Sequence, residues 1–180
     1  MAKDTDNVRG LSAGSVWVAP TGTTAPTDPT AAFGVGYEEL GWLGEDGIVE
    51  AFGFDTDDRR SVEGVLLRRV ITGSEVTFNF RIEERNGPVW DLYYPGSERT
   101  TATGITTLIV NSPSADPRAF AFQIDDGAVH TRILVAKGEI TDRGDVEYKT
   151  EGYEFTMTCY PADDGEVFRV LTDDPAVAAA

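Results

Sequence analysis

The most numerous side chains in this sequence that could do chemistry are carboxylates. They can serve as general acids, nucleophiles and calcium ligands. Asp55, Asp57 and Asp58 lie close together. A calcium loop of the EF-hand type needs oxygen ligands at alternating positions and a closing glutamate at the twelfth. In the stretch DTDDRRSVEGVL, Arg59 and Arg60 stand where ligands belong. The stretch therefore predicts a charged loop over 55–64. A glycosidase pair of carboxylates from distant parts of the chain stays open.

The remaining reactive side chains are few. Cys159 is the one cysteine and His130 the one histidine, which excludes an intramolecular disulfide and a zinc site of four such ligands. A Cys–His catalytic pair is conceivable. However, Cys159 stands on the apolar positions of an alternating run, which favours a buried thiol. His130 lies in an expected strand and reads as a surface or hydrogen-bonded histidine. No glycine-rich nucleotide loop and no G-x-S-x-G elbow occurs. We predict no catalytic residue, no metal and no cofactor.

Apolar residues recur with a period of two along much of the chain, which predicts a mainly β, antiparallel fold. Asp125-Asp126-Gly127 is typical of a tight hairpin turn, because Asp-Gly tolerates the positive φ of such turns. The strand at 131–136 is apolar on both faces. The expected strands are 16–19, 47–54, 65–71, 76–82, 105–110, 120–124, 131–136, 153–159 and 167–171.

One segment favours a helix. Asn86 is a suitable N-cap, and Pro88 falls in the first turn, where its missing N–H costs nothing. An apolar stripe at helical spacing follows, and Pro95-Gly96 ends it. We expect one short helix packed on the sheet.

Length and composition indicate one domain. The chain has 180 residues, of which 41% are hydrophobic and 10% aromatic, enough for a core. We expect an N-terminal arm over 1–13, the domain over 14–172 with an extended loop at 20–36, and a loose tail over 173–180. The start of the chain is polar and no apolar run could span a membrane, which predicts synthesis in the cytoplasm.

The charge of the chain is strongly negative. Its 31 acids against 15 bases give a net charge of −16, a poor match to nucleic-acid phosphates. Nine acids and no Lys or Arg lie between Arg9 and Arg59. Solubility is one explanation, and a surface that repels polyanions is the other.

The order of several stretches resembles one protein family. GSVWVAPTGTTAPTD, ELGWLGEDGIVE, RRVITGSEVTFNFRIEERNGPVWDLYYPG, RAFAFQIDDG and KGEITDRGDVEYKTEGYEFTMTCYP follow one another from about residue 7 to 171. This order is similar to the major tail protein, or tail tube protein, of long-tailed, non-contractile phages of actinobacteria. The resemblance implies an antiparallel β-sandwich or split barrel with one flanking helix. It also implies a structural virion protein whose hexameric rings stack into a tube for DNA ejection.

The resemblance gives the polar segments roles. An extended Thr/Pro-rich loop has long reach and suits a contact between subunits or rings. The charged loop is the second contact candidate. DNA must slide without sticking, which predicts an acidic lumen, and Arg81 argues against uniform negativity there. Contact candidates are Thr21, Thr24, Pro26, Asp28, Pro29, Asp57, Asp58, Arg59 and Arg60; lumen candidates are Glu50, Arg81 and Glu83.

Partners are implied by the resemblance alone: further copies of the chain, a tape measure protein, a tail terminator and tail-tip proteins, with DNA passing unbound and no membrane. The alternatives within this class are a terminator, a connector or a secretion-type tube subunit. From another class, the rival is a monomeric β-sandwich that binds sugar or calcium. The three tryptophans lie in or beside expected core elements, which disfavours an exposed sugar site.

Overall fold

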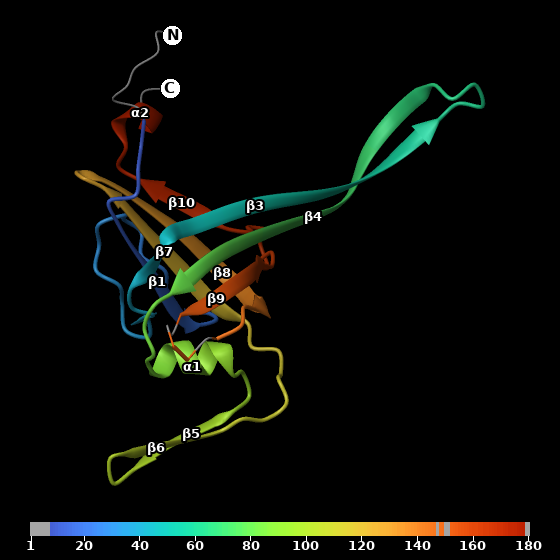
Figure 1. Cartoon of the computed structure of the whole chain (residues 1–180). Coiled ribbons are helices and arrows are strands. Elements are labelled where there is room, and N and C mark those ends of the chain that lie inside the picture. Colours follow the sequence, from blue (N-terminus) through green and yellow to red (C-terminus); the bar gives the residue numbers. More distant parts are fainter. Residues whose placement is uncertain (1–7, 147, 150–151, 179–180) are drawn as a thin grey trace.

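The computed structural model describes residues 8–146, 148–149 and 152–178. Most of the chain forms one antiparallel sheet, in the order β2-β1-β7-β8-β9-β4-β3 with β10 paired to β8, and a separate two-stranded sheet is made by β5 and β6 (Figure 1). The strands of the large sheet are β1 Ala13–Pro20, β2 Glu38–Glu39, β3 Leu43–Arg60, β4 Leu66–Ile82, β7 Arg118–Asp126, β8 Val129–Arg143, β9 Tyr153–Cys159 and β10 Arg169–Thr172. The mainly β, antiparallel prediction is confirmed.

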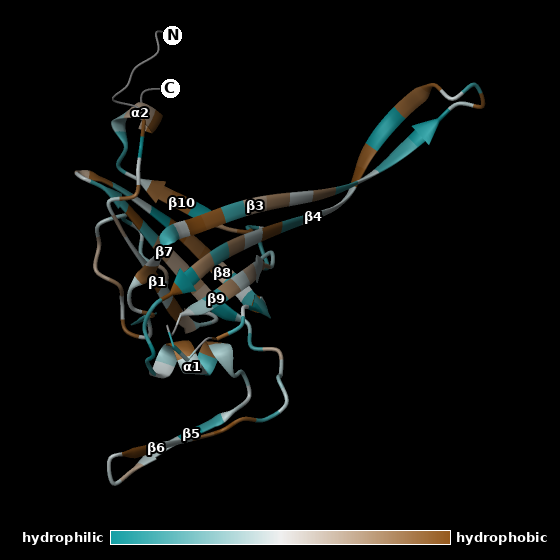
Figure 2. Cartoon of the chain, viewed as in Figure 1, coloured by the Kyte–Doolittle hydropathy of each residue, from teal (hydrophilic) through white to brown (hydrophobic). Residues whose placement is uncertain are grey.

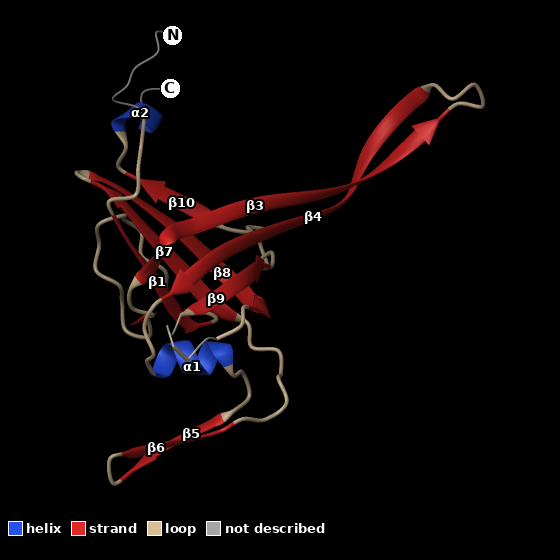
Figure 3. Cartoon of the chain, viewed as in Figure 1, coloured by secondary structure: helices blue, strands red, loops and turns tan. Residues whose placement is uncertain are grey.

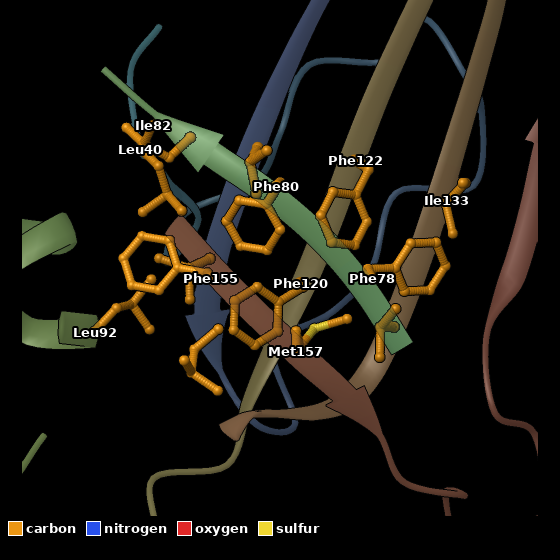
Figure 4. Close-up of a cluster of buried hydrophobic side chains, with 14 of the residues drawn as sticks. Leu40, Phe78, Phe80, Ile82, Leu92, Phe120, Phe122, Ile133, Phe155 and Met157 are labelled. Atoms are coloured by element: carbon orange, nitrogen blue, oxygen red, sulfur yellow. The ribbon is translucent and has the colours of Figure 1, made fainter. Parts of the chain in front are cut away.

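The sheet curls so that strands far apart in its order face each other across the core (Figure 4). Phe78 of β4 stacks on Phe122 of β7 with ring centroids 4.9 Å apart, although β8 and β9 lie between these strands in the sheet. Phe80 meets the same ring edge-on at 5.5 Å. The alternating apolar residues of each strand point into this space, because successive side chains of a strand face opposite sides. The core therefore fills a rolled sheet.

Helix α1 (Gly87–Tyr93) covers one end of the rolled sheet (Figure 3). Asn86 caps it as predicted, since its side chain accepts a hydrogen bond from the backbone N–H of Val89. Val89 and Leu92 are buried against the core. The indole N–H of Trp90 donates to the hydroxyl of Tyr153 at 3.0 Å. The helix is thus fastened to β9 by both apolar and polar contacts.

The predicted charged loop at 55–64 is wrong, because β3 continues through it to Arg60 and the turn is confined to 61–65. The two strands expected at 65–71 and 76–82 are likewise one strand. The pairing of β4 with β3 only shifts register between the two expected strands, from the Asp55–Gly73 pair to the Thr56–Ile71 pair. Figure 1 shows the resulting hairpin crossing the body and extending well beyond it, and Figure 2 shows hydrophilic and hydrophobic bands alternating along both strands.

A second hairpin, of β5 (Glu98–Ala102) and β6 (Ile105–Ile109), projects from the end of the molecule that carries α1 (Figure 1). Strand β6 matches the strand expected at 105–110, whereas β5 was not predicted. Its turn is Thr103-Gly104, with φ of 51° and 77°, the positive values of a two-residue hairpin turn. Threonine rarely adopts that conformation, so Thr103 was not recognised as a turn residue.

The other expected strands are confirmed, although β8 continues to Arg143, well beyond the expected end at 136. The turn at Gly127 is also confirmed, with a φ of 63°. The tail expected to be loose instead contains a helical turn, α2 (Pro175–Ala178), and the buried Asp174. Asp174 forms an ion pair with Arg9 at 2.7 Å, which ties the two ends of the described chain together. Residues 1–7 of the expected N-terminal arm and 179–180 of the tail lie outside the described residues. No described helix has the length and apolarity of a membrane span.

Candidate assembly surfaces

One face of β4, β9 and β8 points away from the core and is polar. Arg81 stands at its centre and forms ion pairs with Glu83 at 2.6 Å and Glu154 at 2.9 Å. The hydrogen bonds that Arg81 donates, first to Glu83 and then to Glu154, raise its pKa, so its charge persists at any physiological pH. The hydroxyl of Thr156 donates to Asn79 at 2.7 Å. These cross-strand bonds fix the polar side chains in place.

The polar face is acidic and grooved. An open groove between β3, β4, β8 and β9 includes Asp46, Asp142 and Glu154 among its lining residues, with Arg81 as the one basic residue there. Glu75 belongs to the same face, because it precedes Thr77, Asn79 and Arg81 in the two-residue alternation of β4. We call this surface the polar face.

The three predicted lumen residues do not share one surface. Glu50 is directly opposite Phe78 in the β3–β4 ladder. Directly paired residues point to the same side of a sheet, so Glu50 lies on the core-facing side of the hairpin. Its charge is close enough to Cys159 to contribute to raising the pKa of that thiol. Arg81 and Glu83 lie on the polar face. The structure therefore separates Glu50 from the other two candidates.

The predicted contact residues at 57–60 lie at the far end of the long hairpin, on exposed strands. Asp58 accepts hydrogen bonds from Arg69 at 2.7 Å and from Arg60 at 3.4 Å. The bond from Arg69 lowers the pKa of Asp58. Neither the turn nor the distal strands pair with the body, because β4 reaches β9 only through residues 77–82. We call residues 56–71 the hairpin tip.

The loop at 20–36 is not a free arm, since part of it packs on the outer side of β1, β7 and β8. Phe33 stacks on Trp17 with centroids 4.3 Å apart. The guanidinium of the buried Arg132 lies 4.2 Å from the Phe33 ring and donates to the backbone oxygens of Asp28 at 3.0 Å and Ala31 at 2.8 Å. Sequence reasoning missed this anchor, although a charged residue in a strand apolar on both faces was the available signal.

The rest of the loop leaves its predicted contact residues accessible to a partner. Thr21, Thr24 and Asp28 are exposed, and Pro26 and Pro29 are half-buried. The hydroxyl and backbone N–H of Thr30 both donate to the carboxylate of Asp28, at 2.6 and 2.7 Å. These bonds lower the pKa of Asp28. The loop thus presents a rigid, polar turn rather than a flexible tether.

Cys159 and His130, both among the described residues, do not form a catalytic pair. Cys159 is buried on the core side of β9, and burial raises its pKa to about 12, so the thiolate nucleophile is absent at neutral pH. His130 instead bonds Asp125 at 2.8 Å, on the β7–β8 hairpin, and that bond raises its pKa. Among the residues described, no three His, Cys, Asp or Glu side chains converge as a metal would require.

The chain resembles known proteins in both sequence and structure. The family model described as phage tail tube protein matches residues 1–180. No protein of curated function matches the chain in sequence. Solved structures that resemble it include the sheath–tube complex of an extracellular contractile injection system, with a TM-score of 0.48, 9% identity and coverage of 96% of this chain and 99% of that one. Another is the virion of a native gene transfer agent particle, with a TM-score of 0.41, 11% identity and coverage of 96% and 100%.

The family match spans the whole chain, so the class is that of structural virion proteins rather than ligand-binding modules. The chain belongs to the phage tail tube protein family and is a structural subunit of the tail tube.

Proposed function

We propose that six copies of this chain close into a ring, that the rings stack into a tube, and that DNA is ejected through its lumen without binding. The observation that carries this proposal is the free edge of β3. Within the described residues, this 18-residue strand forms its ladder with β4 alone. Its other edge presents a long row of backbone N–H and C=O groups, which soluble proteins normally protect. Pairing with a neighbouring copy satisfies them.

The polar face supports a ring in which one particular side of the sheet lines the interior. A sheet that continues from copy to copy through β3 presents the same side of every copy to the ring interior. If the apolar core faces outward from the channel, the polar face lines the lumen with Glu75, Glu83 and Glu154 around a neutralised Arg81. Acidic walls repel phosphates and deny DNA the counterion release that favours binding.

The loop at 20–36 and the hairpin tip supply the contacts between rings in this proposal. Heterologous contacts close into rings when the rotation closes and grow without limit when it does not, and a tube needs one of each kind. The hairpin tip extends beyond the rolled sheet, the loop at 20–36 lies on its outer side, and both carry exposed polar side chains.

The finer identity also belongs to the proposal. The quoted sequence stretches support a long, non-contractile tail and an actinobacterial host. A tape measure protein, a terminator and tail-tip proteins are the partners that such a tail requires, and the chain is made in the host cytoplasm. The buried Cys159 and the separate His130 support a non-enzymatic role.

Electron microscopy of the purified chain over a range of concentrations, with light scattering of the same samples, tests the assembly. Rings or hollow tubes are expected. A particle that stays monomeric at every concentration, and also with purified tail-tip complex, would contradict the proposal.

Thiol labelling of assembled tubes tests which face lines the lumen. Glu154→Cys on the polar face should react with a small maleimide but be protected from a polyethylene-glycol maleimide wider than the channel. Thr107→Cys, on exposed β6, is the matched control and should react with both. Native Cys159 is buried and gives a low background. Equal reaction of both variants with the large reagent would place the polar face outside.

A further inference from the structure

The hairpin tip contains two arginines that its own charges do not neutralise. Arg59 and Arg68 are direct partners in the β3–β4 ladder, so their side chains leave the same face of the hairpin. Among the residues described, neither forms an ion pair or a side-chain hydrogen bond, whereas Arg60 and Arg69 both bond Asp58. Asp57 lies on the same face, opposite Val70, and forms no ion pair with either arginine.

This arrangement is unfavourable in the isolated chain. Like charges directly opposite in an antiparallel pair destabilise it. The tip gains nothing from the body, since it pairs only with itself, and two strands alone are marginally stable in water. An external anion that bonds both guanidinium groups would remove the repulsion and order the tip.

The charge distribution identifies where that anion comes from. Residues 57–69 hold four arginines and three acids, a net charge of +1, while the remaining 11 bases and 28 acids of the chain give −17. The tip cannot fold back to reach its own body, because the extended strand runs roughly 35 Å past residue 77 at about 3.3 Å per residue. The nearest dense source of carboxylates for an assembling subunit is therefore another copy.

The apolar side chains of the tip favour protein over nucleic acid as the partner. Val62, Val65, Leu66, Leu67 and Ile71 are all exposed, by 44 to 107%. Leu66 and Ile71 pair with Arg60 and Thr56, on the face opposite Arg59 and Arg68, and Val62 and Val65 belong to the turn. The apolar cluster therefore covers the turn and the other face of the tip. Exposed apolar surface of this kind is typical of a protein interface, in which apolar contacts accompany the ionic ones. A phosphate backbone would leave this cluster uncovered.

We propose that the cross-strand pair Arg59–Arg68 binds carboxylates on the body of a second copy, and that it is the ionic anchor of the contact between stacked rings. The Asp58–Arg60–Arg69 cluster on the opposite face holds the tip in shape through ion pairs within one copy. This inference rests on the proposed tube and specifies one contact within it.

Cross-linking of isotopically mixed samples tests the pairing. Arg59→Lys with Arg68→Lys keeps the charge and adds amines, which a carbodiimide joins directly to a bonded carboxylate. Equal amounts of ¹⁵N-labelled and unlabelled variant are mixed, and mass spectrometry distinguishes links between copies from links within one. Links between copies, from either lysine to Asp or Glu of the body, are expected. Arg60→Lys with Arg69→Lys is the matched control and should link within one copy, to Asp58.

Charge reversal tests the energetic role. Arg59→Glu with Arg68→Glu should raise the protein concentration needed for tube growth at least tenfold. Lys137→Glu with Arg169→Glu changes the net charge equally, away from the tip, and should raise it no more than about threefold.

The outcomes separate this inference from the proposed tube. Suppose that wild-type tubes form but the two charge-reversal variants, at the tip and at 137 and 169, assemble at the same concentration. The tube then stands and the Arg59–Arg68 contact is overturned. The same conclusion follows if the lysines of Arg59→Lys with Arg68→Lys link only within one copy. If the wild type stays monomeric, the absence of links between copies at the highest concentration overturns the contact as well. Loss of duplex-DNA binding in Arg59→Glu with Arg68→Glu, without links between copies, would assign the pair to nucleic acid instead.

Discussion

At the scale of residues, the ion pair between Arg9 and Asp174 joins the two ends of the described chain. Both guanidinium contacts are short, 2.8 and 2.7 Å, and the backbone N–H of Ala176 donates to the same carboxylate at 2.9 Å. The hydrogen bond from Arg9 is the main reason that the pKa of Asp174 falls from 3.8 to about 2. A carboxylate bonded so well in the folded state resists protonation.

The sign of the pH dependence follows from that lowered pKa. Asp174 makes its full contribution to the free energy of unfolding above the pKa that its carboxyl has in the unfolded chain. This contribution disappears as the pH falls from about 4 to about 2. Asp174→Asn should lower Tm by about 2–4 °C at pH 6, as expected for the loss of one ion pair in a chain of this size. Calorimetry should show the two curves converging near pH 2. A difference that is constant from pH 6 to pH 2 would contradict this role.

At the scale of elements, the loop at 20–36 depends on a single buried cation. Arg132 donates to Gln123 at 2.7 Å as well as to the two loop carbonyls, and burial lowers its pKa without displacing the charge from the physiological range. A buried charge persists only where such partners compensate for the lost water. The loop is therefore held in one conformation before any assembly.

Arg132→Leu tests that dependence. It removes three hydrogen bonds and the stack on Phe33, and should lower the free energy of unfolding by about 2–3 kcal/mol. Urea denaturation measures this, and limited proteolysis should show new cleavage within 21–31. Arg169→Ala breaks an exposed ion pair with Glu166 and should destabilise the fold much less than Arg132→Leu, because exposed ion pairs contribute little. Equal stability of the two variants would show that Arg132 is not the anchor.

At the scale of the whole molecule, the two hairpins make the subunit strongly elongated (Figure 1). A compact chain of this length has a radius of gyration of about 16 Å. Small-angle scattering of dilute wild-type protein should give a clearly larger value. Replacing residues 56–71 by a two-residue turn should bring it closer to 16 Å without unfolding the domain, because those residues pair only with each other. Equal radii for the two proteins would show that the tip folds against the body in solution.

The sequence by itself determined the antiparallel β class, the capped helix after Asn86, the buried Cys159 and the family. These depend on local signals, namely two-residue alternation, a capping side chain with a following proline, and the order of short stretches along the chain. Local patterns suffice because each of these features is decided by neighbours within a few residues.

Only the tertiary structure decided which charged residues meet. The register of β3 and β4 placed Arg59 opposite Arg68 and put Glu50 on the side away from Arg81, because a shift of one residue reverses every side chain of a strand. The rolled sheet likewise brought Arg132 under a loop about a hundred residues earlier in the chain. Such pairings depend on long-range strand contacts and bulges, and no local pattern in the sequence records them.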